Sequence, residues 1–208
     1  MKATGEGVIK FRLHHEEGPP PRRAATAHLR AWFLICRRLE LLGRDPTRYE
    51  GYAYGNLSCR HGGGFLVTCT QTGGKERLAP EDFSQVLAWD LAANRLHSRG
   101  PCRPSSEALT HAVIYETLPA CRFVFHAHSP HVWRRAKALE LPVTDPTAEY
   151  GTPEMAEATV ALLEARGRPA CGLLAMGGHE DGIVAWGRSA EETGSLLVTT
   201  LARALAME

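Results

Sequence analysis

The 208-residue sequence contains no apolar run long enough to cross a bilayer, and Met1 to Pro21 lacks the apolar core of a signal peptide. We therefore expect a cytoplasmic protein with no membrane partner. The formal net charge is only +1, so no strong positive field would attract nucleic acid. Neither nucleic acid nor an acidic membrane is therefore expected as a partner.

Signals for cysteine pairing are also lacking. None of the six cysteines forms a CxxC pair, which argues against a zinc ribbon and a thioredoxin-like redox site. A disulfide framework is not expected in a chain of this size and compartment. We therefore predict free, mostly buried thiols at Cys36, Cys59, Cys69, Cys102, Cys121 and Cys171.

Two common catalytic loops are missing as well. TGGKER, at residues 72–77, lacks the spacing of a Walker A phosphate loop. HGGG, at residues 61–64, resembles a lipase oxyanion loop, but no GxSxG nucleophile elbow accompanies it. Neither a P-loop nucleotidase nor a serine hydrolase is indicated.

What is present is the composition of a globular protein, 44% hydrophobic and 23% charged. We predict an N-terminal edge strand and linker at residues 1–23, followed by one domain at 24–208. Helices alternate with paired short strands, which favours a three-layer α/β/α sandwich with a central mixed, mostly antiparallel sheet. The predicted helices cover residues 24–42, 104–118, 129–140, 152–167 and 189–207, with a further helix start at LAPEDF, residues 78–83.

The sharpest chemical feature is His126-Ala127-His128, which follows the apolar run Phe123-Val124-Phe125. Residues two apart on a strand point to the same face, so both imidazoles can share one metal ion. A catalytic metal site needs a third protein ligand. His179 is the best candidate, because it lies in the glycine-containing turn GGHEDG between two apolar strands.

Three segments are suited to binding an anion. Pro104-Ser105-Ser106-Glu107 places hydroxyls and backbone N–H groups at a helix start, where Glu107 can also serve simply as a dipole-complementing carboxylate. The turns around Asn56 and around Thr72-Gly73 carry polar side chains beside glycine, as phosphate-binding and carboxylate-binding loops do.

In this order, the segments YGNLSCR, TQTGGKERLAPEDF, RPSSEALTHAVIYETLPACRFVFHAHSPHV, EYGTPEMAEAT and GIVAWGRSAEET resemble the class II aldolase/adducin family. The resemblance covers nearly all of the chain after about residue 24. It implies a three-layer α/β/α fold, commonly assembled as a homotetramer with sites between subunits.

The resemblance also implies the roles of the site residues. A divalent ion, expected to be zinc, would be held by His126, His128 and a later histidine, and Glu107 would be the acid/base. Asn56, Thr72, Gly73, Ser105 and Ser106 match positions that hold the substrate's phosphate in the sugar-phosphate members.

Two departures from the family pattern leave alternatives open. The family's third histidine is directly followed by glycine, whereas here the turn reads Gly178-His179-Glu180-Asp181-Gly182, so either His179 or Asp181 completes the site. The stretch from Ser129 to Pro142 is short and offers no equivalent of the tyrosine that protonates the leaving aldehyde in sugar-phosphate aldolases.

The expected function is that of a metal-dependent lyase. Retro-aldol cleavage of a small hydroxy-carbonyl compound, phosphorylated or not, through a metal-stabilised enediolate is the first hypothesis. A decarboxylase, dehydratase or epimerase of the same family is the alternative, and a non-catalytic, adducin-like binding module is the hypothesis from a different class.

Overall fold

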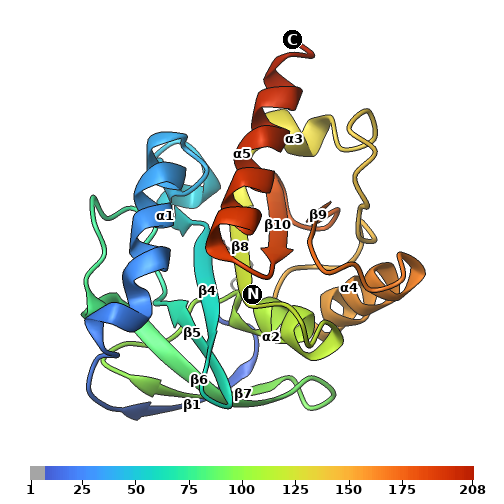
Figure 1. Ribbon diagram of the computed structural model, residues 1–208. Coiled ribbons are helices and arrows are strands. Elements are labelled where there is room, and N and C mark those ends of the chain that lie inside the picture. Colours follow the sequence, from blue (N-terminus) through green and yellow to red (C-terminus); the bar gives the residue numbers. More distant parts are fainter. Residues whose placement is uncertain (1–7) are drawn as a thin grey trace.

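The structure is a computed structural model that describes residues 8–208, so the first part of the predicted N-terminal segment 1–23 lies outside the described residues. Its centre is an eight-stranded sheet in the order β1-β7-β6-β5-β4-β8-β10-β9 (Figure 1). The strands are β1 (Arg12–Glu17), β4 (Asn56–His61), β5 (Gly64–Thr68), β6 (Phe83–Asp90), β7 (Arg95–Gly100), β8 (Phe123–His128), β9 (Gly172–Ala175) and β10 (Gly182–Gly187).

The sheet is mixed and mostly antiparallel, as predicted. Edge strand β1 runs parallel to β7, and every other pairing within this sheet, over residues 8–208, is antiparallel. A small separate sheet joins β2 (Gly43–Arg44) to β3 (Ala53–Tyr54).

Helices cover both faces of the sheet, so the three-layer α/β/α fold is confirmed. One core lies under α1, α3 and α5, and the other lies under α2 and α4. In Figure 1, α5 (red) lies beside β8 and β10, next to α3, and it contacts all three. The helices are α1 (Ala27–Arg38), α2 (Ala108–Thr117), α3 (Pro130–Arg134), α4 (Pro153–Ala165) and α5 (Ala190–Leu205).

Strand β8 lies near the middle of the sheet, between β4 and β10. Its alternation assigns each side chain to one core: Phe125 and Ala127 join the α1/α5 core, and Val124 joins the α2/α4 core. Because alternate residues share a face, His126 and His128 point to the same side as Val124.

Several predicted helices are longer than the observed ones. The helix predicted at 24–42 is the 3-10 turn η1 (Arg23–Thr26) followed by α1, and the one at 129–140 is reduced to α3 and a series of turns. The helix start predicted at LAPEDF is present as a single 3-10 turn, η3 (Pro80–Asp82), which leads directly into β6 instead of continuing as a helix. The same residues suit a single turn as well as a helix start: Pro80 fixes the backbone, and the Asp82 carboxylate accepts a hydrogen bond from Ala79 N at 2.8 Å.

The prediction of six free thiols was wrong. Cys69 and Cys102 form a disulfide with a Cα–Cα distance of 5.9 Å. The segments that hold them run side by side, with Cys69 bridged to Pro104 and Thr70 N donating to Arg103 O at 3.1 Å. This contact joins residues far apart in the sequence, so cysteine spacing could not reveal it.

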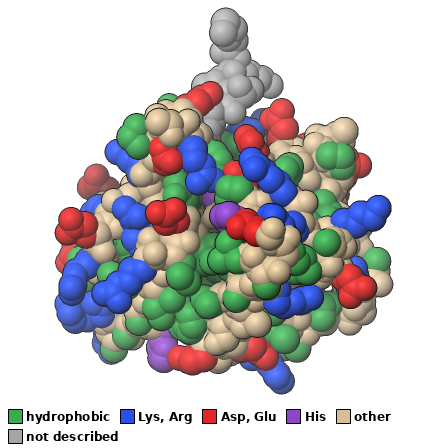
Figure 2. Space-filling view, turned by 90° about the horizontal axis from the view of Figure 1, so that it is seen from above, with side chains coloured by type: hydrophobic (Ala, Val, Ile, Leu, Met, Phe, Trp, Pro, Cys, Tyr) green, Lys and Arg blue, Asp and Glu red, His purple; other side chains and the backbone are tan. Residues whose placement is uncertain are grey.

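No helix within residues 8–208 is both long enough and apolar enough to cross a membrane. Figure 2 shows basic and acidic side chains interspersed on the face that it presents, in keeping with the net charge of +1. That face therefore carries no broad patch of a single charge.

Candidate metal centre

His126 and His128 lie at the C-terminal end of β8, in the interior of the protein. Both are buried, and their Nε2 atoms are 3.1 Å apart. His126 Nδ1 donates to the backbone oxygen of Ile183 at 3.1 Å, which leaves the lone pair of its Nε2 directed at His128. A backbone partner of this kind is the usual support for a metal-ligating histidine.

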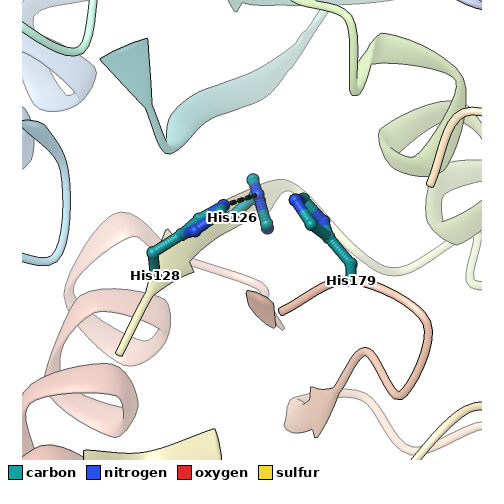
Figure 3. Close-up of side chains that lie close together, drawn as sticks. All are labelled: His126, His128 and His179. Atoms are coloured by element: carbon teal, nitrogen blue, oxygen red, sulfur yellow. Dashed lines mark hydrogen bonds between the residues drawn. The ribbon is translucent and has the colours of Figure 1, made fainter. Parts of the chain in front are cut away.

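His179 comes to the same place from the turn between β9 and β10. Its ring stacks on His126, with centroids 5.1 Å apart, and meets His128 edge-on at 4.7 Å. Figure 3 shows the three rings pointing toward one another, two from β8 and one from the turn. The three potential ligand atoms lie within 4.8 Å of one another, and all three side chains are buried.

The chemistry of this group fits a divalent ion that prefers nitrogen ligands. Burial, the largest cause, holds the pKa of His126 and of His128 well below the usual value, so both imidazoles are neutral near pH 7. Neutral imidazole is the form that binds zinc and similar ions. A cation between the converging nitrogens would take the place of the hydrogen that joins the two Nε2 atoms, which are 3.1 Å apart.

Asp181, the alternative third ligand, is turned toward a different group. Its Oδ2 accepts a hydrogen bond from Tyr49 Oη at 2.7 Å and forms an ion pair with Arg48 Nη2 at 3.2 Å. Asp181 has a left-handed backbone with φ of 61°, and Gly182 N donates to His179 O at 3.0 Å to close the turn. The structure thus brings His179, and not Asp181, into the histidine group.

Glu107 lies beside this group, at the N-terminal end of α2. Its carboxylate is buried, with Oε1 3.6 Å from His179 Nδ1 and Oε2 accepting from Thr110 Oγ1 at 3.0 Å. Its backbone N–H donates to Ser105 Oγ at 3.2 Å. A buried carboxylate held this close to the histidines is placed for proton transfer to a molecule bound there.

The predicted anion-binding residues are buried close by. Asn56 is the register neighbour of His126, and its buried Oδ1 has no hydrogen-bond partner among the described residues. Gly73 packs so tightly that a Cβ there would lie 2.3 Å from Tyr54 O, and the Tyr54 ring is 5.4 Å from that of His128. The loop around Gly73 therefore reaches the histidine group through Tyr54.

The remaining anion-binding candidates are held by backbone contacts. Thr72 Oγ1 donates to Cys69 O at 2.7 Å, and Ser105 N donates to Thr68 O at 3.0 Å. Ser106 is 5% exposed. These contacts, with the Cys69–Cys102 disulfide, tie the Thr72 loop to the serine-rich start of α2.

Three aromatic and basic neighbours of the histidines were missed in the sequence. Tyr49 meets His128 edge-on at 4.6 Å, Arg48 reaches Asp181, and Tyr150 stacks on His179 at 4.7 Å. Tyr150 belongs to the EYGTPEMAEAT segment, which was a usable signal. Arg48 and Tyr49 lie in a loop without a motif, so nothing in the sequence pointed to them.

Comparison with known proteins identifies the family of the chain. The family described as Class II Aldolase and Adducin N-terminal domain matches residues 45–206. A methylthioribulose-1-phosphate dehydratase of Xanthomonas oryzae pv. oryzae is 34% identical over 115 residues, which are 54% of this chain and 46% of that protein. The matched part is thus less than half of that relative's length.

Solved structures share the fold. The L-fuculose-1-phosphate aldolase of Thermus thermophilus superposes with a TM-score of 0.64 at 24% identity, covering 89% of this chain and 93% of that one. A sugar-phosphate aldolase of Thermotoga maritima superposes with a TM-score of 0.68 at 14% identity, covering 89% and 94%.

Proposed function

Since the chain belongs to the class II aldolase and adducin family, we propose that it is a metal-dependent lyase acting on a small hydroxy-carbonyl compound. The observation that carries this proposal is the buried group of His126, His128 and His179 with Glu107 Oε1 3.6 Å from His179. Three imidazoles and an adjacent carboxylate are the parts of a hydrolytic or lyase metal centre rather than of a purely structural core.

In this proposal the three histidines hold the divalent ion, and zinc is the expected one. A bound ion of this kind supplies Lewis acidity, which stabilises negative charge that develops on substrate oxygens. Neighbouring groups hold the histidine rings in place. The carbonyl of Ile183 keeps the His126 ring in one tautomer, and the Tyr150 ring stacks against His179.

Glu107 is the proposed acid/base. In retro-aldol cleavage it takes a proton from the substrate hydroxyl and returns one to the carbon left negative when the C–C bond breaks. The hydrogen bond from Thr110 Oγ1 holds the carboxylate in place, and burial of the carboxylate keeps water away from the proton in transit.

Asn56, Thr72, Gly73, Ser105 and Ser106 are the proposed residues for a substrate anion. The free Oδ1 of Asn56 beside His126 supports a polar ligand at that point. The hydroxyl of Ser105, which accepts a hydrogen bond from Glu107 N, still has its own hydrogen to donate to a phosphate or carboxylate.

Dehydration is the second candidate reaction. The specific observation in its favour is the dehydratase relative at 34% identity. The Glu107 carboxylate would then remove the proton from the carbon next to the substrate carbonyl and pass a proton to the hydroxyl group on the neighbouring carbon, which leaves as water. A product assay separates the two reactions, because cleavage yields two carbon compounds and dehydration yields one.

Metal content tests the proposed ligands. We expect close to one zinc ion at this site in wild-type protein, loss of that ion in His179→Ala, and retention in Asp181→Ala, because the Asp181 carboxylate already binds Tyr49 and Arg48. Loss only in Asp181→Ala would assign the third ligand to Asp181. No zinc in the wild type, even after reconstitution, would favour an adducin-like binding module.

Activity tests the proposed acid/base. On a panel of phosphorylated and unphosphorylated hydroxy-carbonyl compounds, Glu107→Gln should lower kcat by about 10²–10⁴-fold while the metal content stays unchanged. Glu157→Gln, an exposed carboxylate on α4, is the matched control. Normal turnover by Glu107→Gln would remove Glu107 from the mechanism.

Family members often form oligomers, and we propose a homotetramer for this chain, which light scattering of the purified protein would test.

A further inference from the structure

A second group of metal-binding side chains lies at the opposite end of the sheet from β9, on the edge strand β1. His14 and Glu16 are two residues apart on β1, so they share one face. His14 is the register partner of His97 on the parallel strand β7. The three side chains therefore converge because of strand register alone.

The geometry of this group is already close to that of a metal site. Glu16 Oε1 lies 2.8 Å from His97 Nε2 and 3.5 Å from His14 Nε2, and the three donor atoms are within 4.8 Å of one another. Ligands at about 2.0–2.1 Å around a tetrahedral zinc ion lie roughly 3.3 Å apart. Small rotations of exposed side chains are enough to close the remaining difference.

The position of Glu16 is informative, because its register partner on β7 is Arg99. The Glu16 carboxylate contacts the two histidines, whereas the Arg99 side chain extends toward Gly18, where a Cβ would lie 2.9 Å from it. A carboxylate between two imidazoles offers the mixed oxygen and nitrogen donors that zinc, nickel and copper accept.

The surroundings determine which ions are suitable. Arg12 and Arg99 flank the group on the same face of the sheet, so the local charge disfavours a cation that binds by charge alone. Calcium and magnesium are disfavoured both by the flanking positive charge and by the donor atoms, because they need several oxygen ligands and the group has one carboxylate. Imidazole donors favour a transition metal instead, and the flanking arginines would weaken its affinity.

There is also room for the rest of a coordination shell. The side chains of His14, Glu16 and His97 are 72%, 47% and 34% exposed. A surface cavity of about 400 Å³, lined by His14, His97, Arg12 and Trp89 among others, adjoins the two histidines. Water can therefore fill the positions that the three side chains leave open.

We propose that His14, Glu16 and His97 form a second divalent transition-metal site, separate from the buried histidine group, that fastens β1 to β7. Among residues 8–208, β1 has β7 as its single neighbour in the eight-stranded sheet. An ion held by two ligands from β1 and one from β7 adds a cross-link to that edge, so bound metal stabilises the folded chain.

The test is a zinc titration of chelator-treated, full-length protein, followed by calorimetry and metal analysis. Wild type should bind two zinc ions per chain, and His97→Gln and Glu16→Gln should bind one. His15→Gln is the matched control and should still bind two, because His15 lies between the proposed ligands in sequence but bonds Ser98 at 2.9 Å on the other face of β1.

A second background separates this site from the buried one. The double variant His126→Gln/His128→Gln should keep one zinc ion and a zinc-induced rise in melting temperature, and adding His97→Gln should abolish both. If the double variant binds no zinc, the edge site is refuted while the buried site stands. If His97→Gln leaves the wild-type stoichiometry unchanged, the edge site is likewise refuted.

Competition tests the selectivity. Millimolar magnesium or calcium should not displace zinc from the double variant, and displacement by either ion would overturn the argument from donor type and flanking charge.

Discussion

Replacing Cys102 by serine should cost this protein a large part of its stability. The Cys69–Cys102 disulfide spans a sequence separation of 33 residues, which contains the whole β6–β7 hairpin. The chain-entropy relation for a loop of this size gives about 4 kcal/mol at 25 °C. For a protein of about this length, a loss of about 3–4 kcal/mol corresponds to a fall in Tm of roughly 6–16 °C.

Urea denaturation without reductant measures this difference in the free energy of unfolding. Cys171→Ser is the matched control, because Cys171 is an exposed free thiol whose removal should change little. Reductant should lower the stability of the wild type toward that of Cys102→Ser and leave the variant itself unchanged. A difference under about 1 kcal/mol, or a wild type indifferent to reductant, would refute the cross-link.

Two further predictions concern buried positions. His111 is hydrogen-bonded to Ser58 and fully buried, and burial lowers its pKa to about 3 in the folded protein. In the unfolded chain the imidazole takes up a proton below about pH 6.5, so the free energy of unfolding falls as the pH drops below that value. Between pH 7 and pH 5 this amounts to about 2 kcal/mol, and metal-free His111→Gln should show a correspondingly flatter pH dependence in urea denaturation; an equally steep one would contradict it. Gly194→Ala places a Cβ 2.2 Å from the Trp32 ring and should cost about 1–3 kcal/mol in thermal unfolding, whereas exposed Ser195→Ala on the same helix should be near neutral.

The part of the site that strand periodicity controls could be predicted from the sequence. FVFHAH alternates between two cores, so the prediction that His126 and His128 share a face needed only the two-residue period of a strand. The antiparallel hairpins and the covering helices followed from equally local patterns, such as the glycine turn between β4 and β5.

Long-range pairing accounts for the parts that local patterns missed. LAPEDF carries a proline and two acids suited to a helix start, yet the chain turns after Asp82 because Phe83 and the residues after it pair with β5. Pairing between strands is decided by partners distant in sequence, and it overrides a short helical signal. The disulfide was not predicted for the same reason, because it depends on the pairing of the Cys69 segment with the Pro104 segment, which are far apart in the sequence.

The turn that carries His179 combines both kinds of information. The sequence left His179 and Asp181 as alternatives, because the turn is longer than the family pattern and either side chain could point inward. In the structure their contacts differ, because Asp181 is contacted by a loop more than a hundred residues earlier. In that loop Tyr49 and Glu50 both have left-handed backbones, with φ of 50° and 56°.

Such conformations are unfavourable for residues other than glycine, and they persist only where surrounding contacts hold them. Here the Tyr49 hydroxyl and the Arg48 guanidinium both contact the Asp181 carboxylate, which fixes one end of the turn, while Gly182 N closes the turn on His179 O. With Asp181 engaged in this way, His179 is the side chain of the turn that faces β8. The position of His179 in the longer turn therefore depends on the contacts that Arg48 and Tyr49 make with Asp181.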